Sequence, residues 1–159
     1  MKKKFDTKNL IMLIVCILIP LAVGGLAALL TKNSMDVYQT INKPVLSPPG
    51  ILFPIVWTIL YILMGVSLYL VYKSNSPYRP AALLVFFLQL IFNFIWSLIF
   101  FNGRMYTFAF IWLLALWLLI ILMIAEFKKV KPIAAWLQIP YLLWVTFAAY
   151  LNLSIAIMN

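Results

Sequence analysis

The sequence predicts an all-α, polytopic integral membrane protein: a single domain, residues 1–159, built as a bundle of five transmembrane helices with a long ordered first loop. Hydrophobic residues make up 67% of the chain and charged residues 9%, whereas soluble domains carry roughly 45–50% apolar and about 25% charged residues. Five apolar stretches contain no charged residue, and roughly 20 helical residues are enough to cross a hydrocarbon core of ~30 Å. The five stretches are residues 10–30, 51–72, 81–101, 105–125 and 133–158.

The composition also excludes several classes of protein. A soluble enzyme, a disordered tail and a nucleic-acid-binding protein are excluded, because so apolar a chain has too little polar surface to be wetted. With no His, three acidic residues and one Cys, the chain has neither a disulfide framework nor the residues for a His or Cys metal cluster. The apolar stretches are continuous instead of alternating, which favours helices over barrel strands.

The first stretch, residues 10–30, follows a lysine-rich tail in the way that the apolar region of a signal peptide does. It is longer than the ~7–15 residues of such a region, so we interpret it as an anchoring helix. Pro20 is expected to kink this helix. Gly24 and Ala28 form a pair of small residues four positions apart, which favours close packing against another helix.

The second stretch carries aromatic side chains on one helical face, and the third and fifth stretches each carry aromatic and amide side chains on one face. A residue advances the helix by 100°, so residues three or four apart share a face; Pro140 is expected to kink the fifth helix. Asn93 lies in mid-span, where a buried amide needs a partner, and the sequence leaves open whether that partner is another helix or a ligand. The three faces consist of Trp57, Tyr61, Met64, Gly65, Leu68 and Tyr72; of Gln89, Asn93, Trp96, Ser97 and Phe100; and of Gln138, Tyr141, Trp144, Ala148 and Asn152.

The connection of residues 31–50 is the one long loop. Structureless loops of more than about 12–15 residues are usually functional or disordered, and this one contains apolar residues together with Pro44, Pro48 and Pro49, which stiffen the backbone. It is therefore expected to be ordered. The composition fits two interpretations, a lid over a ligand site and a packing loop without a ligand.

The basic residues predict the orientation. Nine lie in the N-terminal tail and in the second and fourth connections, and three lie in the other two connections, so the positive-inside rule places the N-terminus in the cytoplasm and the C-terminus outside. The nine are Lys2, Lys3, Lys4, Lys8, Lys73, Arg79, Lys128, Lys129 and Lys131, and the three are Lys32, Lys43 and Arg104.

Motifs on three of the predicted helices resemble the signature of the TspO/MBR family, the tryptophan-rich sensory proteins related to the mitochondrial translocator (peripheral benzodiazepine receptor). The resemblance covers nearly the whole chain. The first motif reads Lys43-Pro44-x-x-x-Pro48-Pro49-Gly50-x-x-Phe53-Pro54-x-x-Trp57-Thr58-x-Leu60-Tyr61-x-x-Met64-Gly65. The second reads Asn93-x-x-Trp96-Ser97-x-x-Phe100-Phe101, and the third reads Pro140-Tyr141-x-x-Trp144-x-x-Phe147-Ala148-x-x-Leu151-Asn152.

The resemblance implies a five-helix bundle, commonly a homodimer, with a pocket closed by the first loop. It implies binding of protoporphyrin IX, haem and other tetrapyrroles, of isoquinoline and benzodiazepine-type drugs, and in some members of cholesterol. Trp57 and Trp144 match tryptophans associated with light-dependent porphyrin breakdown in bacterial relatives. With Ser97, which shares the face of Asn93, the expected ligand-binding residues are Tyr38, Pro48, Phe53, Trp57, Tyr61, Asn93, Ser97, Trp144, Ala148 and Leu151.

Two positions depart from the family pattern. Leu46 stands where the loop motif usually has Trp or Phe, which is expected to loosen the packing of the loop. After Tyr150 the chain has no Lys or Arg, so the sterol-recognition pattern of an apolar residue, Tyr and a basic residue is incomplete and gives no support for sterol binding.

Four functions are compatible with these residues. The leading hypothesis is a membrane receptor or sensor for tetrapyrroles and other flat hydrophobic molecules, without an obligatory cofactor and without catalytic or metal-ligating residues. The second is light- and oxygen-dependent porphyrin degradation, in which Trp57 and Trp144 would support chemistry carried by the bound porphyrin. The third is a tetrapyrrole transporter, and the fourth is a structural subunit with a dry, tightly packed core. The expected partners are the lipid bilayer and a second copy of the chain, and the expected location is a bacterial plasma membrane.

Overall fold

The fold is known from a computed structural model, which describes residues 6–159. Within them, five helical segments are long and apolar enough to cross a membrane, so the all-helical, five-span prediction is confirmed. The elements are α1 (Thr7–Thr31), the 3₁₀ turn η1 (Lys32–Ser34), α2 (Val37–Thr40), α3 (Leu52–Tyr72), α4 (Arg79–Ser97), the π-helical turn η2 (Leu98–Asn102), α5 (Tyr106–Val130), α6 (Pro132–Trp136) and α7 (Ile139–Met158).

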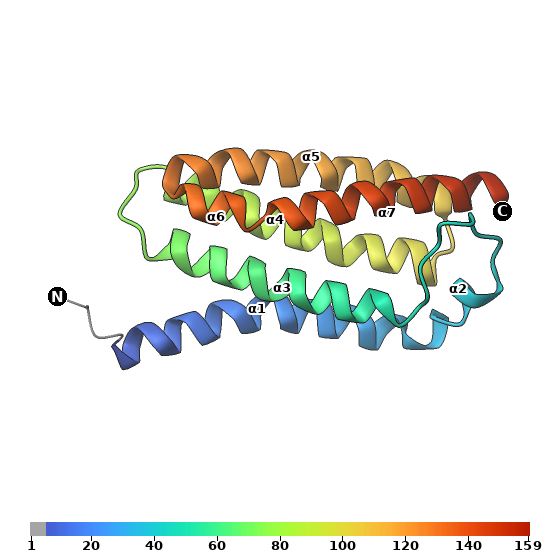
Figure 1. The fold of residues 1–159 in the computed structure, drawn as a ribbon, viewed down its shortest axis with the longest axis horizontal. Coiled ribbons are helices and arrows are strands. Elements are labelled where there is room, and N and C mark those ends of the chain that lie inside the picture. Colours follow the sequence, from blue (N-terminus) through green and yellow to red (C-terminus); the bar gives the residue numbers. More distant parts are fainter. Residues whose placement is uncertain (1–5) are drawn as a thin grey trace.

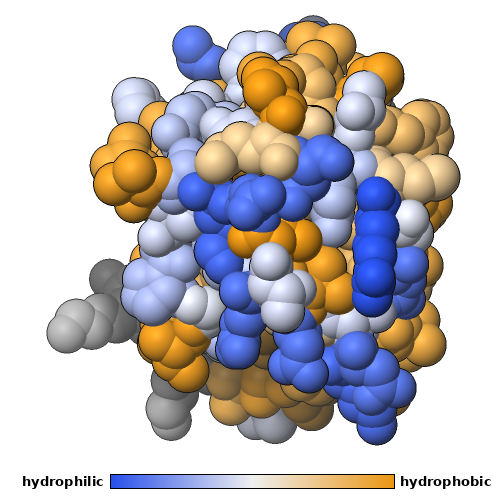
Figure 2. Space-filling view, turned by 90° about the vertical axis from the view of Figure 1, so that its right-hand side faces the viewer, coloured by the Kyte–Doolittle hydropathy of each residue, from blue (hydrophilic) through white to orange (hydrophobic). Residues whose placement is uncertain are grey.

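The long helices run antiparallel to their neighbours in sequence, with α1 and α3 on one side of the bundle and α5, α6 and α7 on the other (Figure 1). The connections therefore gather at two ends. One end holds the start of α1 and the α3–α4 and α5–α6 connections, and the other holds the first loop, the η2–α5 connection and the C-terminus. The three cations counted for one side of the membrane thus lie at the loop end, where hydrophilic residues gather over the middle and hydrophobic residues around the sides (Figure 2). Lys2, Lys3 and Lys4 lie outside the described residues, and the orientation across the membrane stays a prediction.

Helix α1 packs closely against α3 at two glycines, Gly24 of α1 and Gly65 of α3. A Cβ atom at Gly65 of α3 would lie 2.3 Å from the Cα atom of Ile17 and 2.8 Å from the carbonyl oxygen of Cys16, so only glycine allows the two backbones to come so near. The helix continues without interruption from Thr7 to Thr31, through Pro20.

The fifth span is interrupted between α6 and α7, at residues 137–138, and Pro140 lies after the interruption in the first turn of α7. A proline in a first turn is tolerated because the N–H group that it lacks would have no partner inside the helix. The amide of Gln138 packs into the bundle, where its Nε2 donates to the Ser67 Oγ (2.8 Å) and to the Leu63 carbonyl (3.3 Å). These bonds fix α7 against α3 at the interruption.

The first loop is ordered, as expected. The Tyr38 hydroxyl donates a hydrogen bond to the Pro48 carbonyl (3.1 Å), and the Lys43 ammonium donates to the Tyr38 carbonyl and lies 4.6 Å from the centre of its ring. Burial raises the pKa of the Tyr38 phenol above its ordinary value. Leu46 is exposed and takes no part in holding the loop.

A pair of asparagines fastens the loop to the end of α7. The backbone N–H of Asn42 donates to the Asn159 Oδ1 (3.1 Å), and the Asn159 Nδ2 donates to the Asn42 carbonyl (2.9 Å). We call these two residues the asparagine clasp. It joins positions that lie 117 residues apart in the sequence.

Candidate ligand-binding site

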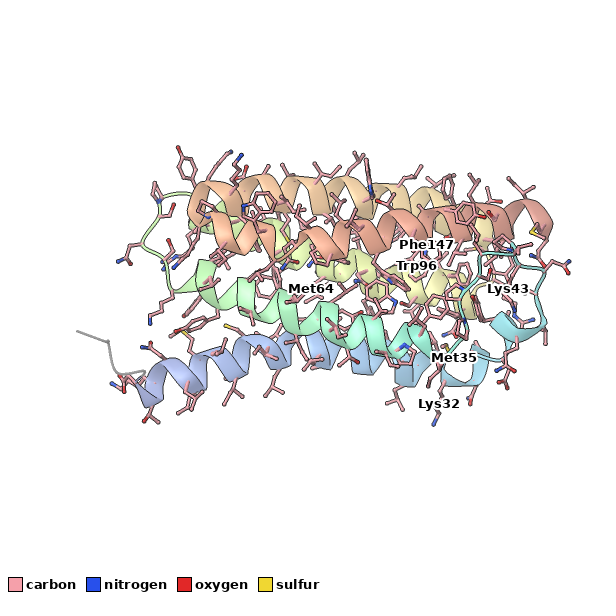
Figure 3. All side chains as sticks on the ribbon, in the orientation of Figure 1. Lys32, Met35, Lys43, Met64, Trp96 and Phe147 are labelled. Atoms are coloured by element: carbon pink, nitrogen blue, oxygen red, sulfur yellow. The ribbon has the colours of Figure 1, made fainter. Side chains whose placement is uncertain are left out.

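A cavity of about 310 Å³ lies directly beneath the first loop. It is partly open and is lined by α1, α3, the end of α4 with η2, and α7, with Met35 and Tyr38 contributed by the loop. Figure 3 shows Met35 at the loop end of the bundle and Trp96 between the helices in the same half of the molecule, with Met64 further along α3. The wall includes Gly24, Ala28 and Thr31; Phe53, Pro54, Trp57, Thr58 and Tyr61; Trp96, Ser97, Phe100 and Phe101; and Trp144, Ala148, Leu151, Asn152 and Ile155.

Two groups of paired aromatic rings line the cavity from the loop inward. The ring of Tyr38 meets Phe53 edge-on at a centroid distance of 5.1 Å, and Phe53 meets Trp144 at 5.8 Å. On the same helix as Phe53, Trp57 stacks on Tyr61 at 5.6 Å. These spacings are those of favourable aromatic pairs, so the wall is a pre-formed aromatic surface that extends over two helices and the loop.

Few polar groups face this surface, and most of them are already paired. The Trp96 Nε1 donates to the Asn152 Oδ1 (3.1 Å), and the Asn152 Nδ2 donates to the Tyr106 carbonyl (2.8 Å). The Trp144 Nε1 is buried and has no hydrogen-bond partner within residues 6–159. The wall therefore offers a ligand mainly apolar contacts.

A buried polar chain lies behind the cavity wall. The Tyr61 hydroxyl donates to the Asn93 Oδ1 at 3.4 Å, a long bond, and the Asn93 Nδ2 donates to the Tyr141 oxygen at 2.9 Å. The Tyr141 hydroxyl in turn donates to the Gln89 Oε1 at 2.7 Å. The chain joins α3, α4 and α7, so Asn93 links helices and holds a cavity residue in place.

Eight of the ten predicted ligand-binding residues line the cavity: Tyr38, Phe53, Trp57, Tyr61, Ser97, Trp144, Ala148 and Leu151. Pro48 and Asn93 do not. The Pro48 carbonyl accepts a hydrogen bond from the Tyr38 hydroxyl, and Asn93 accepts one from the hydroxyl of the wall residue Tyr61. Both residues support wall residues instead of forming the wall.

Other wall residues were not among those predicted to bind. Trp96 and Phe100 lie on the predicted aromatic face of the third span, so the helical periodicity of that span could have identified them as wall residues. Phe101 lies beside Phe100 in sequence and also lines the cavity. The N–H of Gly103 bonds to the carbonyl of Leu98, five residues earlier, and such a π-helical turn places residues differently from an α-helix. No sequence pattern signals this turn.

The described part of the chain, residues 6–159, contains no group of three or more His, Cys, Asp or Glu side chains close enough to hold a metal ion. The lining of the cavity consists mainly of aromatic and aliphatic side chains, with a few hydroxyl groups and the amide of Asn152. Such a surface recognises a ligand by shape and by stacking.

Comparison with known proteins identifies the family. The profile of the TspO/MBR family matches residues 16–158. This chain belongs to the TspO/MBR family. It is 38% identical to the Tryptophan-rich protein TspO of Chlorobaculum tepidum over 157 residues, which cover 96% of this chain and 98% of the relative. The Tryptophan-rich sensory protein of Cereibacter sphaeroides is 32% identical, with 77% of this chain and 76% of the relative covered. The Translocator protein of Ovis aries is 34% identical, with 72% and 70% covered.

Family membership agrees with the five membrane-crossing helices, and together they establish an integral membrane protein. The family match begins within α1 and ends in α7. It therefore includes every helix that contributes to the cavity wall.

Proposed function

We propose that this chain is a membrane receptor or sensor for tetrapyrroles, with protoporphyrin IX and haem as the expected ligands, and for other flat hydrophobic small molecules. The observation that carries the proposal is the aromatic cavity beneath the ordered first loop. Binding there would make the protein part of porphyrin homeostasis. The names of two relatives, a sensory protein and a translocator, are consistent with such a role.

The physical fit rests on the shape and polarity of the cavity. Small-molecule sites occupy roughly 300–1,000 Å³ and are lined mainly by apolar and aromatic side chains, so a volume of 310 Å³ is at the lower end of this range. A porphyrin macrocycle has apolar faces that stack on aromatic rings. In this proposal the macrocycle enters edge-on, and the loop shifts to make room for the part that the present cavity does not hold.

The proposal includes the setting of the protein. We place it in a bacterial plasma membrane as a homodimer, with the N-terminus in the cytoplasm and the cavity end of the bundle outside. The positive-inside rule supports the orientation: Lys32, Lys43 and Arg104 are the only basic residues of the two connections at the cavity end.

Light-dependent porphyrin degradation is the second candidate. Trp57 and Trp144 both lie in the cavity wall, and Trp57 stacks on Tyr61, so a porphyrin in the cavity would be in contact with oxidisable rings. The bound porphyrin would have to supply the photochemistry, because the wall presents no carboxylate, thiol or imidazole.

A titration with protoporphyrin IX in the dark tests binding. The detergent-purified protein is followed by quenching of tryptophan fluorescence, and saturable binding in the low micromolar range is expected. Ala148→Phe places a ring inside the cavity and is expected to abolish saturation. Leu143→Phe adds a ring to the same helix at an exposed position, and this matched control is expected to bind as the wild type does. Unsaturable quenching, or equal binding by the two variants, would contradict the proposal.

Illumination of the same samples separates the two candidates. If the protein is a receptor, the bound porphyrin is expected to bleach at the same rate as free porphyrin. A degrading protein converts the bound porphyrin to a new product, and conversion is lost in a Trp57→Phe, Trp144→Phe double variant that still binds. The second result would replace the receptor hypothesis with the degradation hypothesis.

A further inference from the structure

The ring of Tyr61 lies directly on the backbone of α1 at Gly24, at the edge of the cavity. A Cβ atom at Gly24 would lie 2.3 Å from Cε2 of that ring and 2.8 Å from both Cδ2 and Cζ. Carbon atoms in contact normally stay about 3.5–4.0 Å apart. The ring therefore occupies the space that any side chain at position 24 would need.

Tyr61 is held on its other sides. Trp57 stacks on the ring at a centroid distance of 5.6 Å and an interplanar angle of 29°, and the hydroxyl bonds to Asn93, which is itself buried. Both Tyr61 and Gly24 line the cavity. The open space next to the ring is thus the cavity, and a ring displaced from α1 moves into it.

We infer that Gly24 is a specificity-determining residue: by giving the ring of Tyr61 a place against α1, it keeps the cavity deep enough for a large flat ligand. This inference rests on the proposed function for the identity of the ligand, but the geometry of the cavity can be tested without any ligand. An alanine at position 24 displaces the ring and makes the site select for smaller molecules.

The neighbouring glycine supplies a matched comparison. Gly25 also lines the cavity, but within residues 6–159 a Cβ built there would meet no side chain and no backbone of another element within 4 Å. Gly25→Ala therefore adds the same methyl group to the same helix, with the same gain in helix propensity, but without contact with Tyr61. A difference between the two alanine variants reports the displacement of the ring and not the added methyl group.

Thiol labelling measures the space in the cavity directly. Ser97, in the wall, is replaced by cysteine in a Cys16→Ser background, and the protein is treated with a small methanethiosulfonate or with a bulky pyrene maleimide. In Gly24→Ala the ratio of bulky to small labelling rate is expected to fall about tenfold, the low end of the discrimination that one methylene gives in an apolar pocket. In Gly25→Ala, whose new methyl group also borders the cavity but displaces no ring, the ratio is expected to fall less than in Gly24→Ala.

Replacement of the Tyr61 ring by a smaller side chain tests whether the effect of Gly24→Ala acts through that ring. Gly24→Ala combined with Tyr61→Leu is expected to restore the labelling ratio, because the leucine leaves room for the new methyl group. An unchanged ratio in Gly24→Ala, a faster reaction with the bulky reagent, or a loss that Tyr61→Leu does not restore would each overturn the inference.

Dark titration of the same variants with protoporphyrin IX and with isoquinoline separates this inference from the proposed function. Gly24→Ala is expected to weaken porphyrin binding about tenfold and isoquinoline binding much less. Equal weakening for the two ligands overturns the inference. If the wild type binds no porphyrin while the labelling ratio falls as expected, the proposed function fails and the control of cavity depth by Gly24 is supported.

Discussion

Replacement of Asn93 by leucine tests whether the polar chain behind the cavity stabilises the bundle. The amide of Asn93 accepts from the Tyr61 hydroxyl at 3.4 Å and donates to the Tyr141 oxygen at 2.9 Å. Leucine has a similar size and removes both bonds. Tyr141 keeps a partner, since its hydroxyl still donates to Gln89, but the buried hydroxyl of Tyr61 loses the one partner that it has within residues 6–159.

The expected loss of stability follows from these contacts. Hydrogen bonds between membrane helices contribute about 0.6 kcal/mol each on average, which gives about 1 kcal/mol for the two bonds. A buried hydroxyl without a partner costs about 1–3 kcal/mol, and the higher helix propensity of leucine offsets a few tenths of a kcal/mol. We expect Asn93→Leu to lower the free energy of unfolding by about 2 kcal/mol.

Equilibrium unfolding in mixed micelles, followed by tryptophan fluorescence while the fraction of dodecyl sulfate is raised, measures this change. Asn102→Leu is the matched control: its Nδ2 also bonds to another helix, at the Leu30 carbonyl (3.1 Å), but the bond is exposed. The control is expected to lose less than about 0.5 kcal/mol, because water replaces an exposed bond. If Asn93→Leu is as stable as the wild type, the polar chain does not hold the helices together and our reasoning about Asn93 is wrong.

Three further predictions concern packing, indole hydrogen bonds and the loop. Gly65→Ala should lower the free energy of unfolding by about 2 kcal/mol in the same assay, because the new Cβ would lie 2.3 Å from backbone atoms of α1 that cannot yield; unchanged stability would contradict the close contact of the helices. Trp96→Phe should lose about 1 kcal/mol more stability than Trp144→Phe, because the indole N–H of Trp96 has a buried amide partner and that of Trp144 has none within residues 6–159; equal losses would show that the Trp96 bond contributes nothing. Asn159→Ala removes one half of the asparagine clasp and should raise the rate of amide hydrogen exchange at Asn42 about fivefold, measured by mass spectrometry; an unchanged rate would mean that the clasp does not restrain the loop.

The five spans were predictable because the bilayer imposes one strong requirement. A segment that crosses it needs about 20 apolar residues with internal backbone hydrogen bonds, and charge-free stretches meet that requirement visibly in the sequence. The order of the first loop was also predictable, since prolines and an aromatic residue such as Tyr38 favour a packed conformation. Its attachment to α7 was not, because the asparagine clasp joins two common polar residues 117 positions apart.

The cavity wall was predicted in large part by helical periodicity and by the family motifs. Periodicity places a residue on a face but does not say how deep that face lies, so it did not separate Asn93 from the wall residue Tyr61 to which it is hydrogen-bonded. It also fails where the helix changes type, as in the π-helical turn that brings Phe101 to the cavity.

The pattern of small residues in α1 likewise predicts a close contact without identifying the neighbouring residue. The pair Gly24 and Ala28 predicts close packing against another helix, and within residues 6–159 only Gly24 has such a contact, because Ala28 is exposed and borders the cavity. The structure shows that the neighbour of Gly24 is an aromatic ring of the same chain. The size of the cavity depends on that contact, which no pattern along α1 alone reveals.

Protection of a cavity cysteine by porphyrin tests the central claim most directly. The Cys16→Ser, Ser97→Cys variant is labelled in the dark with the small methanethiosulfonate at increasing concentrations of protoporphyrin IX. Labelling is expected to slow with the same concentration dependence as the quenching of tryptophan fluorescence, because a porphyrin bound in the cavity occupies the space in front of position 97. Full quenching with no slowing of the labelling would place the porphyrin outside the cavity and contradict the account.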